Sequence, residues 1–179
     1  MPELVSPWII GPSGAGKTTL ARSLAKRLRG ENKPCILLDG DEVRALFDQR
    51  LGYDRKSREK QTIRVKNLAR FASRQSIIPI VAIIHPFEDD RITCREELPG
   101  YFEVYMKCDM KELIKRDNKK LYLPALRGDK KNVVGVDIPF EKPINPDLII
   151  DTAILTADEC FRVLWDAIFH SDDWSSSKG

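Results

Sequence analysis

An α/β fold, with helices on both faces of a mostly parallel sheet, is the fold class that this sequence predicts. Short apolar runs alternate along the chain with longer stretches in which apolar residues recur at helical spacing. The 179 residues, 42% of them hydrophobic and 32% charged, are enough to bury one core without disulfides or structural metal. No internal repeat is visible, so we expect a single domain over residues 1–170 and a flexible tail over residues 171–179.

The first half of the chain is expected to alternate strand and helix. Residues 8–10 are an apolar run that predicts a strand, and the helix-spaced apolar residues 20–28 follow it across a glycine-rich loop. A second strand is expected at residues 35–38 and a helix at residues 41–51. Residues 57–73, which hold few apolar positions among many basic ones, predict a long surface helix.

The second half continues the same alternation. Residues 77–84 are almost unbroken in apolar character, which is typical of a strand covered on both faces. A strand at residues 101–107, a short helix at residues 110–116, a strand at residues 147–150 and a helix at residues 157–169 follow in order. Strands and helices that alternate in this way predict a parallel sheet wrapped on both sides.

Residues 117–143 interrupt the alternation with scattered proline and glycine, and loops this long in compact domains are usually functional or disordered. The overlapping stretch 115–131 holds seven Lys or Arg against two Asp, so we interpret this region as a lid that closes over anionic ligands. Residues 50–74 are also basic, with nine Lys or Arg against two acidic residues. The alternative for both stretches is an ordinary solvated face.

Composition argues against several classes of protein. The net charge of +3 is far below that of a polycation that coats nucleic acid, and the basic helix lacks interleaved aromatic residues for stacking on bases. The four cysteines form no CxxC pair, which argues against a zinc site or a disulfide framework. No window approaches the roughly 18 apolar residues of a membrane span. We therefore expect a cytoplasmic protein without nucleic-acid or membrane partners.

The strongest motif is a phosphate-binding loop between the first strand and the first helix. Residues 11–18, GPSGAGKT, fit the pattern GxxxxGK[ST] in the context that this motif requires. Glycines let backbone N–H groups turn inward around a phosphate, Lys17 reaches the β- and γ-phosphates, and the Thr18 hydroxyl can bind Mg²⁺. The sequence thus predicts a three-layer P-loop NTPase fold with ATP and Mg²⁺ as ligands. The residues expected to bind the nucleotide are Gly11, Ser13, Gly14, Ala15, Gly16, Lys17, Thr18 and Thr19.

Two strands end in a carboxylate that could serve the same site. Asp39 and Asp41 follow the strand at residues 35–38, and Asp39 is the expected second oxygen ligand of Mg²⁺. One of the two carboxylates could accept a proton from an acceptor hydroxyl while the other supports the structure. The alternative for Asp41 is a cap on the helix that follows it. Asp151 ends the last strand and is at least as well explained as a cap.

Several further stretches resemble one family in order and spacing. Besides the phosphate loop they are residues 38–44 (LDGDEVR), residues 51–53 (LGY) with Arg58, residues 116–117 (RD) with 121–122 (LY), residues 135–141 (GVDIPFE) and residues 148–152 (LIIDT). Over most of the stretch from residue 8 to residue 151 the chain resembles the adenylylsulfate (APS) kinases. This set is far more specific than the phosphate loop alone.

The resemblance implies a P-loop kinase that passes the γ-phosphoryl group of MgATP to the ribose 3′-hydroxyl of APS, which gives PAPS for sulfate assimilation or sulfation. It implies that Asp41 is the base or orienting carboxylate and that Arg44 and Arg58 hold the phosphosulfate of the acceptor. It also implies that Tyr53 lies against the acceptor base and Arg116 near the adenine of ATP. The alternative for Tyr53 is a core aromatic. APS kinases are often dimers, so a homodimer is a further expectation.

The acceptor half departs from the family pattern. Gln61, expected to contact the acceptor, stands where the family usually has Asn, and Ile63 replaces the first of two arginines. The usual Ser-Pro pair after the third strand is here His85-Pro86, so His85 is either a phosphate contact or an ordinary strand-end histidine. Leu123-Pro124 replaces a Lys pair in the lid, and Val133 replaces an aromatic residue. A missing stacking partner costs roughly 1–3 kcal/mol where nothing compensates.

Three hypotheses follow. The first is an APS kinase, for which Asp41, Arg44 and Arg58 are the best support. The second is a kinase of the same build that acts on a different nucleotide-like or sugar-phosphate acceptor, which the departures motivate. The third is a nucleotide-binding module without turnover, against which Lys17, Thr18 and Asp41 argue.

Overall fold

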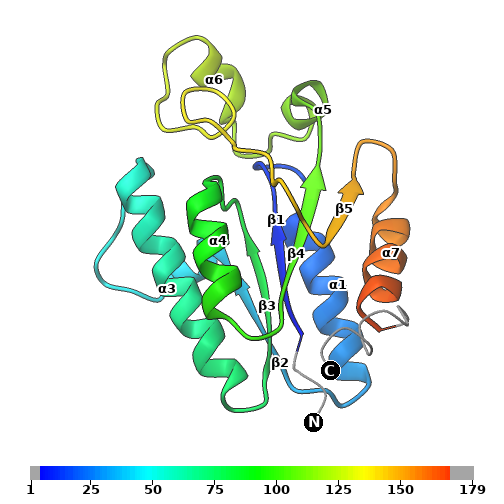
Figure 1. Cartoon of the computed structure of the whole chain (residues 1–179). Helices are drawn as coiled ribbons and strands as arrows, with labels where there is room; N and C mark the ends of the chain where they lie inside the picture. Colours follow the sequence, from blue (N-terminus) through cyan, green and yellow to red (C-terminus); the bar gives the residue numbers. More distant parts are fainter. Residues whose placement is uncertain (1–4, 170–179) are drawn as a thin grey trace.

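The computed structural model describes residues 5–169, which form one five-stranded parallel sheet with helices on both faces (Figure 1). The strand order is β2-β3-β1-β4-β5, and every pair of neighbouring strands runs parallel. The strands are β1 (Ser6–Ile10), β2 (Cys35–Asp39), β3 (Ile78–Ile83), β4 (Tyr101–Lys107) and β5 (Leu148–Asp151). The predicted α/β class is confirmed.

Two apolar clusters, one on each face of the sheet, hold the three layers together. On one face α1 (Lys17–Gly30) and α7 (Ala157–Phe169) pack against buried residues such as Ile9 and Val104. On the other face α3 (Arg55–Ser73) and α4 (Glu88–Glu97) cover residues that include Trp8. Alternate residues of one strand thus point to opposite faces, and both faces are apolar because both are buried.

The remaining helices lie at the carboxyl edge of the sheet. They are α2 (Gly40–Ala45), α5 (Met110–Lys115) and α6 (Tyr122–Leu126). Figure 1 shows α5, α6 and the long loop around α6 beyond the tips of the strand arrows. In parallel α/β sheets, ligands bind in the crevice at this edge, so the loops that gather there are the place to expect a ligand site.

The helix expected at residues 41–51 ends at Ala45 instead. Arg44 donates to the backbone oxygens of Leu51 (3.3 Å) and Gly52 (3.0 Å), so the chain folds back toward it. In a continuous helix residues 44 and 52 would lie about 12 Å apart, so these contacts require the chain to leave the helix.

Two helices were not expected. The helix α4 has almost no apolar periodicity, because it buries Arg91 and Cys94 among eight otherwise mostly polar residues. The helix α6 contains Pro124, which suggested a turn. Proline is tolerated there because it stands in the first turn, where its missing N–H has no partner to lose.

The other expected elements are found within three residues of their predicted ends, and α7 has the predicted bounds. Over residues 5–169, no helix is both long and apolar enough to cross a membrane. The tail expected at residues 171–179 lies outside the described residues, and the single-domain assignment of residues 1–170 stays a prediction.

Candidate active site

The phosphate loop joins β1 to α1 and opens at the carboxyl edge of the sheet. Gly14 (φ +84°) and Gly16 (φ +88°) hold left-handed conformations that side chains rarely adopt, which turns backbone N–H groups toward one side. Gly11 has another role, since a Cβ on it would come within 2.7 Å of the Met106 backbone oxygen. The loop therefore combines an inward-facing cradle with close packing on β4.

A cavity of about 630 Å³ opens over this loop, a size typical of nucleotide and cofactor sites. All of the residues expected to bind the nucleotide line it except Gly11, and Arg116 lines it as well. Asp39 and Asp41 form part of the same lining. One cavity thus brings together the phosphate loop, the carboxylates of Asp39 and Asp41, and Arg116.

Lys17 is the charged group of the loop. Its Nζ donates to the Pro12 backbone oxygen (2.7 Å). The pKa of Lys17 is lowered to about 8, first by burial and then by the positive charge of Lys119, while the carboxylates of Asp39 and Asp41 act in the opposite direction. The lowered pKa means that burial disfavours the charged form of Lys17. A bound phosphate would favour the charged form and raise this pKa again, so the loop suits an anionic ligand.

Thr18 and Asp39 are in direct contact, since the Thr18 hydroxyl donates to the Asp39 carboxylate (2.6 Å). Asp39 also caps α2 by accepting from the Asp41 backbone N–H (3.0 Å). The cap that sequence reasoning offered as the alternative role of Asp41 thus belongs to Asp39. A hydroxyl and a carboxylate side by side are the oxygen ligands that Mg²⁺ prefers, so these two residues fit the ion.

Asp151 has no part in this arrangement. Its carboxylate accepts from Lys107 Nζ (2.8 Å) and from the Ala153 backbone N–H (3.1 Å). These contacts lower the pKa of Asp151, chiefly through Lys107. They hold Asp151 in the turn after β5, away from the site. The helix cap offered for Asp151 is wrong, because α7 begins at Ala157 and the Thr156 hydroxyl accepts from the Glu159 backbone N–H (3.3 Å).

A second cavity, of about 240 Å³, adjoins the first, because Ser13, Gly40, Asp41 and Lys119 line both. Every residue expected to bind the acceptor lines this second cavity: Asp41, Arg44, Tyr53, Arg58 and Gln61. Val133 and His85 line it too. The two cavities therefore meet at Asp41, and we call the second one the acceptor cavity.

Two arginines and Tyr53 form one wall of the acceptor cavity. The Arg44 guanidinium stacks 4.7 Å from the centre of the Tyr53 ring, and Arg58 donates to the backbone oxygens of Tyr53 (2.7 Å) and Asn132 (2.9 Å). Burial and then the neighbouring Arg44 lower the pKa of Arg58, which still stays charged. Tyr53 is 54% exposed, so the core interpretation of this aromatic is wrong.

The lid contributes two contacts that sequence reasoning did not single out. Lys119 pairs with Asp41, and the Tyr122 hydroxyl donates to the Ser13 backbone oxygen (2.7 Å) in the phosphate loop. Only the excess of positive charge in the lid pointed toward Lys119, and the motif residue Tyr122 had no assigned role. Together these contacts bind the lid to both halves of the site.

The far end of the nucleotide cavity comes from the loop after β5 and the start of α7. Thr152, Leu155 and Thr156 line it beside Arg116, whose Nη2 donates to the Thr152 backbone oxygen (3.0 Å). Sequence reasoning assigned no role to Thr152, Leu155 or Thr156. The available signal was their place just after a parallel strand, at the ligand-binding edge of the sheet.

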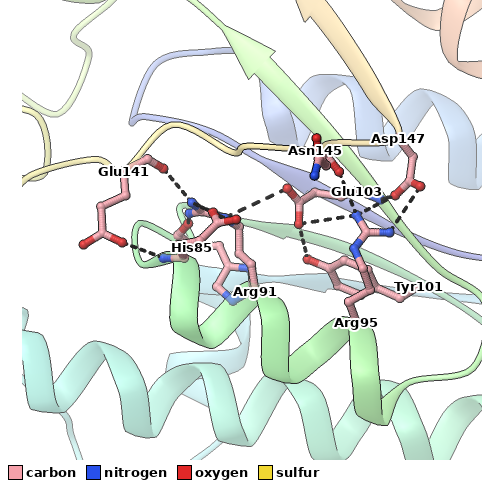
Figure 2. A network of polar contacts seen from close by, with 9 residues as sticks. His85, Arg91, Arg95, Tyr101, Glu103, Glu141, Asn145 and Asp147 are labelled. Atoms are coloured by element: carbon pink, nitrogen blue, oxygen red, sulfur yellow. Dashed lines mark hydrogen bonds and ion pairs between the residues drawn. The ribbon is translucent and has the colours of Figure 1, made fainter.

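A buried polar network supports the acceptor cavity from behind, and Figure 2 shows it between α4, β4 and the loop that leads to β5. The fully buried Arg91 donates to the backbone oxygens of His85 and Glu141 (both 2.7 Å) and to the Glu88 carboxylate (2.9 Å). Glu141 accepts in turn from the Glu88 backbone N–H (2.7 Å). Arg91 thus fixes the ends of two segments that supply His85 and Val133 to the cavity.

Comparison with known proteins agrees with this geometry. The family model described as adenylylsulphate kinase matches residues 4–151. The chain belongs to the adenylylsulfate kinase family. It is therefore an ATP-dependent kinase, and the predicted P-loop fold, family and enzyme class are confirmed.

Two relatives and one solved structure are similar to this chain over most of its length. A probable adenylyl-sulfate kinase of Archaeoglobus fulgidus is 43% identical over 145 residues, which cover 81% of this chain and 94% of the relative. A cytidine diphosphoramidate kinase of Campylobacter jejuni is 40% identical over 146 residues, which cover 82% of this chain and 85% of the relative. The structure of the Mycobacterium tuberculosis APS kinase CysC in complex with AMPPNP and APS superposes with a TM-score of 0.86 at 26% identity, covering 94% of this chain and 99% of that one.

Proposed function

We propose that the protein transfers the γ-phosphoryl group of ATP to the ribose 3′-hydroxyl of adenylylsulfate. The observation that carries the proposal is the junction of the two cavities at Asp41, which brings a phosphate loop and a cationic acceptor wall to one carboxylate. Phosphoryl transfer depends mainly on alignment and charge neutralisation, which such a junction can supply. Family membership and relatives named adenylyl-sulfate kinase support the same acceptor.

In this mechanism the ATP phosphates lie on the loop, with Lys17 and the N-terminus of α1 balancing their charge. Thr18 and Asp39 would hold Mg²⁺, which when bound neutralises charge on the β- and γ-phosphates. Arg44 and Arg58 bind the anionic phosphosulfate of the acceptor. Arg116 lies toward the base of ATP.

Asp41 orients the acceptor 3′-hydroxyl and takes its proton as the new bond forms. The bond from the 3′-oxygen to the γ-phosphorus forms while the bond from that phosphorus to the β,γ-bridging oxygen breaks, and ADP leaves with the electron pair. The proton passes from Asp41 to solvent. Before substrate enters, Lys119 pairs with Oδ2 of Asp41, so the acceptor hydroxyl approaches the other carboxylate oxygen while Lys119 stays in place.

The direct test is ADP release from MgATP in the presence of APS, with PAPS identified as the product. Turnover that needs both substrates supports the proposal. Bound ATP with no turnover at millimolar APS would overturn it. Omission of Mg²⁺ from the same assay tests the metal, and full activity in the presence of a chelator would contradict that part.

A second candidate acceptor is cytidine diphosphoramidate. Val133 favours it, because this small side chain stands in the acceptor cavity where the APS kinases usually carry an aromatic residue that stacks on adenine. The relative from Campylobacter jejuni bears this substrate in its name. A higher kcat/KM with cytidine diphosphoramidate than with APS, measured by ADP release, would make it the preferred acceptor.

We also propose that the protein forms a homodimer and acts in the cytoplasm. Both statements rest on what is usual in the family. Light scattering behind size-exclusion chromatography tests the dimer, and a mass of about 20.5 kDa would contradict it.

A further inference from the structure

Two buried residues in the wall of the acceptor cavity carry polar atoms without a hydrogen-bond partner among residues 5–169. They are Gln61, through Oε1, and His85, through both ring nitrogens. Gln61 is 6% exposed and His85 is 2% exposed, and both line the cavity. Buried polar atoms are nearly always paired, so unpaired ones in a cavity wall indicate groups that a ligand satisfies.

The orientation of the Gln61 amide follows from its other contact. Its Nε2 donates to the Gly40 backbone oxygen (3.3 Å). If the amide were turned over, two oxygens would face each other, so the unpaired atom is the oxygen. A carbonyl oxygen can only accept, and the ligand must therefore present a hydrogen-bond donor to it.

His85 is a neutral group in the same wall. Its ring lies 5.3 Å from that of Trp8, and its backbone oxygen accepts from Arg91 as Figure 2 shows. Burial and then the charge of Arg91 lower the pKa of His85 to about 3, so the ring is uncharged at neutral pH. A neutral imidazole offers one donor and one acceptor, which suits a ligand group that can both accept and donate.

These neutral atoms lie beside the cationic part of the cavity. Arg58 and Gln61 are three residues apart on α3, which brings their side chains to the same face of the helix. Arg44 and Arg58 suit the anionic end of an acceptor nucleotide. The group next to Gln61 therefore belongs to that anionic end, and it should carry an N–H or O–H.

A sulfate and an amidated phosphate differ in this one property. As the end of a nucleotide anhydride, each carries a single negative charge and has nearly the same tetrahedral shape. A sulfate end has only acceptor oxygens, whereas an amidated phosphate has an NH₂ group that donates. A water molecule could serve Gln61 in the free protein, but a sulfate that displaces it cannot replace its donated hydrogen bond.

We propose that Gln61 and His85 extend the acceptor range of this kinase to nucleotides whose 5′ anhydride ends in an amidated phosphate. The inference rests on the proposed function, because it assumes phosphoryl transfer to a 3′-hydroxyl in this cavity. Gln61 accepts a hydrogen bond from the amide N–H of the acceptor, and His85 contacts the same group.

The test compares APS with adenosine diphosphoramidate, which shares its base, its ribose and its net charge. The wild-type enzyme should turn over adenosine diphosphoramidate with a kcat/KM at least equal to that for APS. Turnover of APS alone would overturn the inference and leave the proposed function intact. Turnover of neither acceptor, nor of cytidine diphosphoramidate, with ATP still bound, would overturn both.

Variants assign the discrimination to Gln61. Gln61→Met keeps the length of the side chain and removes the oxygen, so kcat/KM for adenosine diphosphoramidate should fall about tenfold and that for APS less than threefold. Lys60→Met, one residue earlier on the exposed face of α3, is the matched control and should leave the ratio unchanged. Equal losses with both acceptors in Gln61→Met would contradict the proposal, because base and ribose contacts are common to both.

His85→Phe provides a second measurement should Gln61→Met fold poorly. It keeps the ring that packs near Trp8 and removes both nitrogens. The ratio of the two kcat/KM values should move in the same direction as in Gln61→Met. An unchanged ratio would remove His85 from the proposal, and unchanged ratios in both variants would overturn it.

Discussion

Lys119 in the lid forms an ion pair with Asp41, 78 residues earlier in the chain. Because both residues line both cavities, this pair spans the place where the two substrates meet. Lys119 also lowers the pKa of Lys17. One lid residue thus acts on the acceptor carboxylate and on the phosphate-binding lysine.

Removal of this contact should impair turnover. In Lys119→Met, Asp41 loses its cation and the lid loses one of its links to the site, so kcat should fall about tenfold or more in the ADP-release assay. Lys120→Met is the matched control, since Lys120 is exposed and lines neither cavity. A loss in Lys119→Met no larger than in this control would mean that the pair is incidental.

The lowered pKa of Lys17 should make stability depend on pH in a defined direction. Between about pH 8, where burial has moved this pKa, and the ordinary value of 10.5, the unfolded state binds the proton and the folded state does not. Stability therefore rises with pH across this window, relative to a variant without the group. The check is urea unfolding of wild type and Lys17→Met from pH 7 to pH 10. A difference in unfolding free energy that stays constant would contradict the shift.

Substitutions of Asp39 and Asp41, at the end of β2 and the start of α2, should have different kinetic effects. Asp41→Asn removes the proton acceptor, so kcat should fall about 10²- to 10⁴-fold while ATP affinity changes little. Asp39→Asn retains the cap on α2 and weakens the oxygen pair with Thr18, so it should raise the Mg²⁺ concentration needed for half-maximal rate. Steady-state kinetics over ATP, acceptor and Mg²⁺ distinguish the cases. A pure loss of ATP affinity in Asp41→Asn would indicate a metal role for that residue instead.

The sequence predicts much of the fold and of the nucleotide half of the site for a physical reason. A phosphate loop is local, since one strand, one turn and one helix start define it, and apolar periodicity marks the strands that position it. The acceptor half depends on contacts over long separations, such as Arg58 with Asn132, which no local pattern encodes. Motif resemblance supplied Arg44 and Arg58 but neither the contact of Arg58 with Asn132 nor the pairing of Lys119 with Asp41.

The same distinction explains why α4 was missed. Its buried side is polar, with Arg91 in place of an apolar residue, so periodicity gave no signal. Its stability comes instead from acidic residues in the first turn and from the network around Arg91. Polar burial of this kind is visible only once the partners from β4 and the loop before β5 are in place.

Arg91 should consequently be the most sensitive polar residue of the fold. Arg91 is 2% exposed and faces the carboxylates of Glu88 and Glu103, so Arg91→Met would remove the buried cation from this negative charge. The loss of unfolding free energy should be about 3–5 kcal/mol, and KM for the acceptor should rise, because His85 and Glu141 lose their anchor. Arg95→Met is the comparison within the same network, since Arg95 also lies 3.9 Å from Glu103 but pairs more closely with Asp147 at a more exposed position, and its loss should stay within about 1 kcal/mol. Urea unfolding of both variants measures the difference, and equal losses would show that the network around Arg91 does not depend on its buried charge.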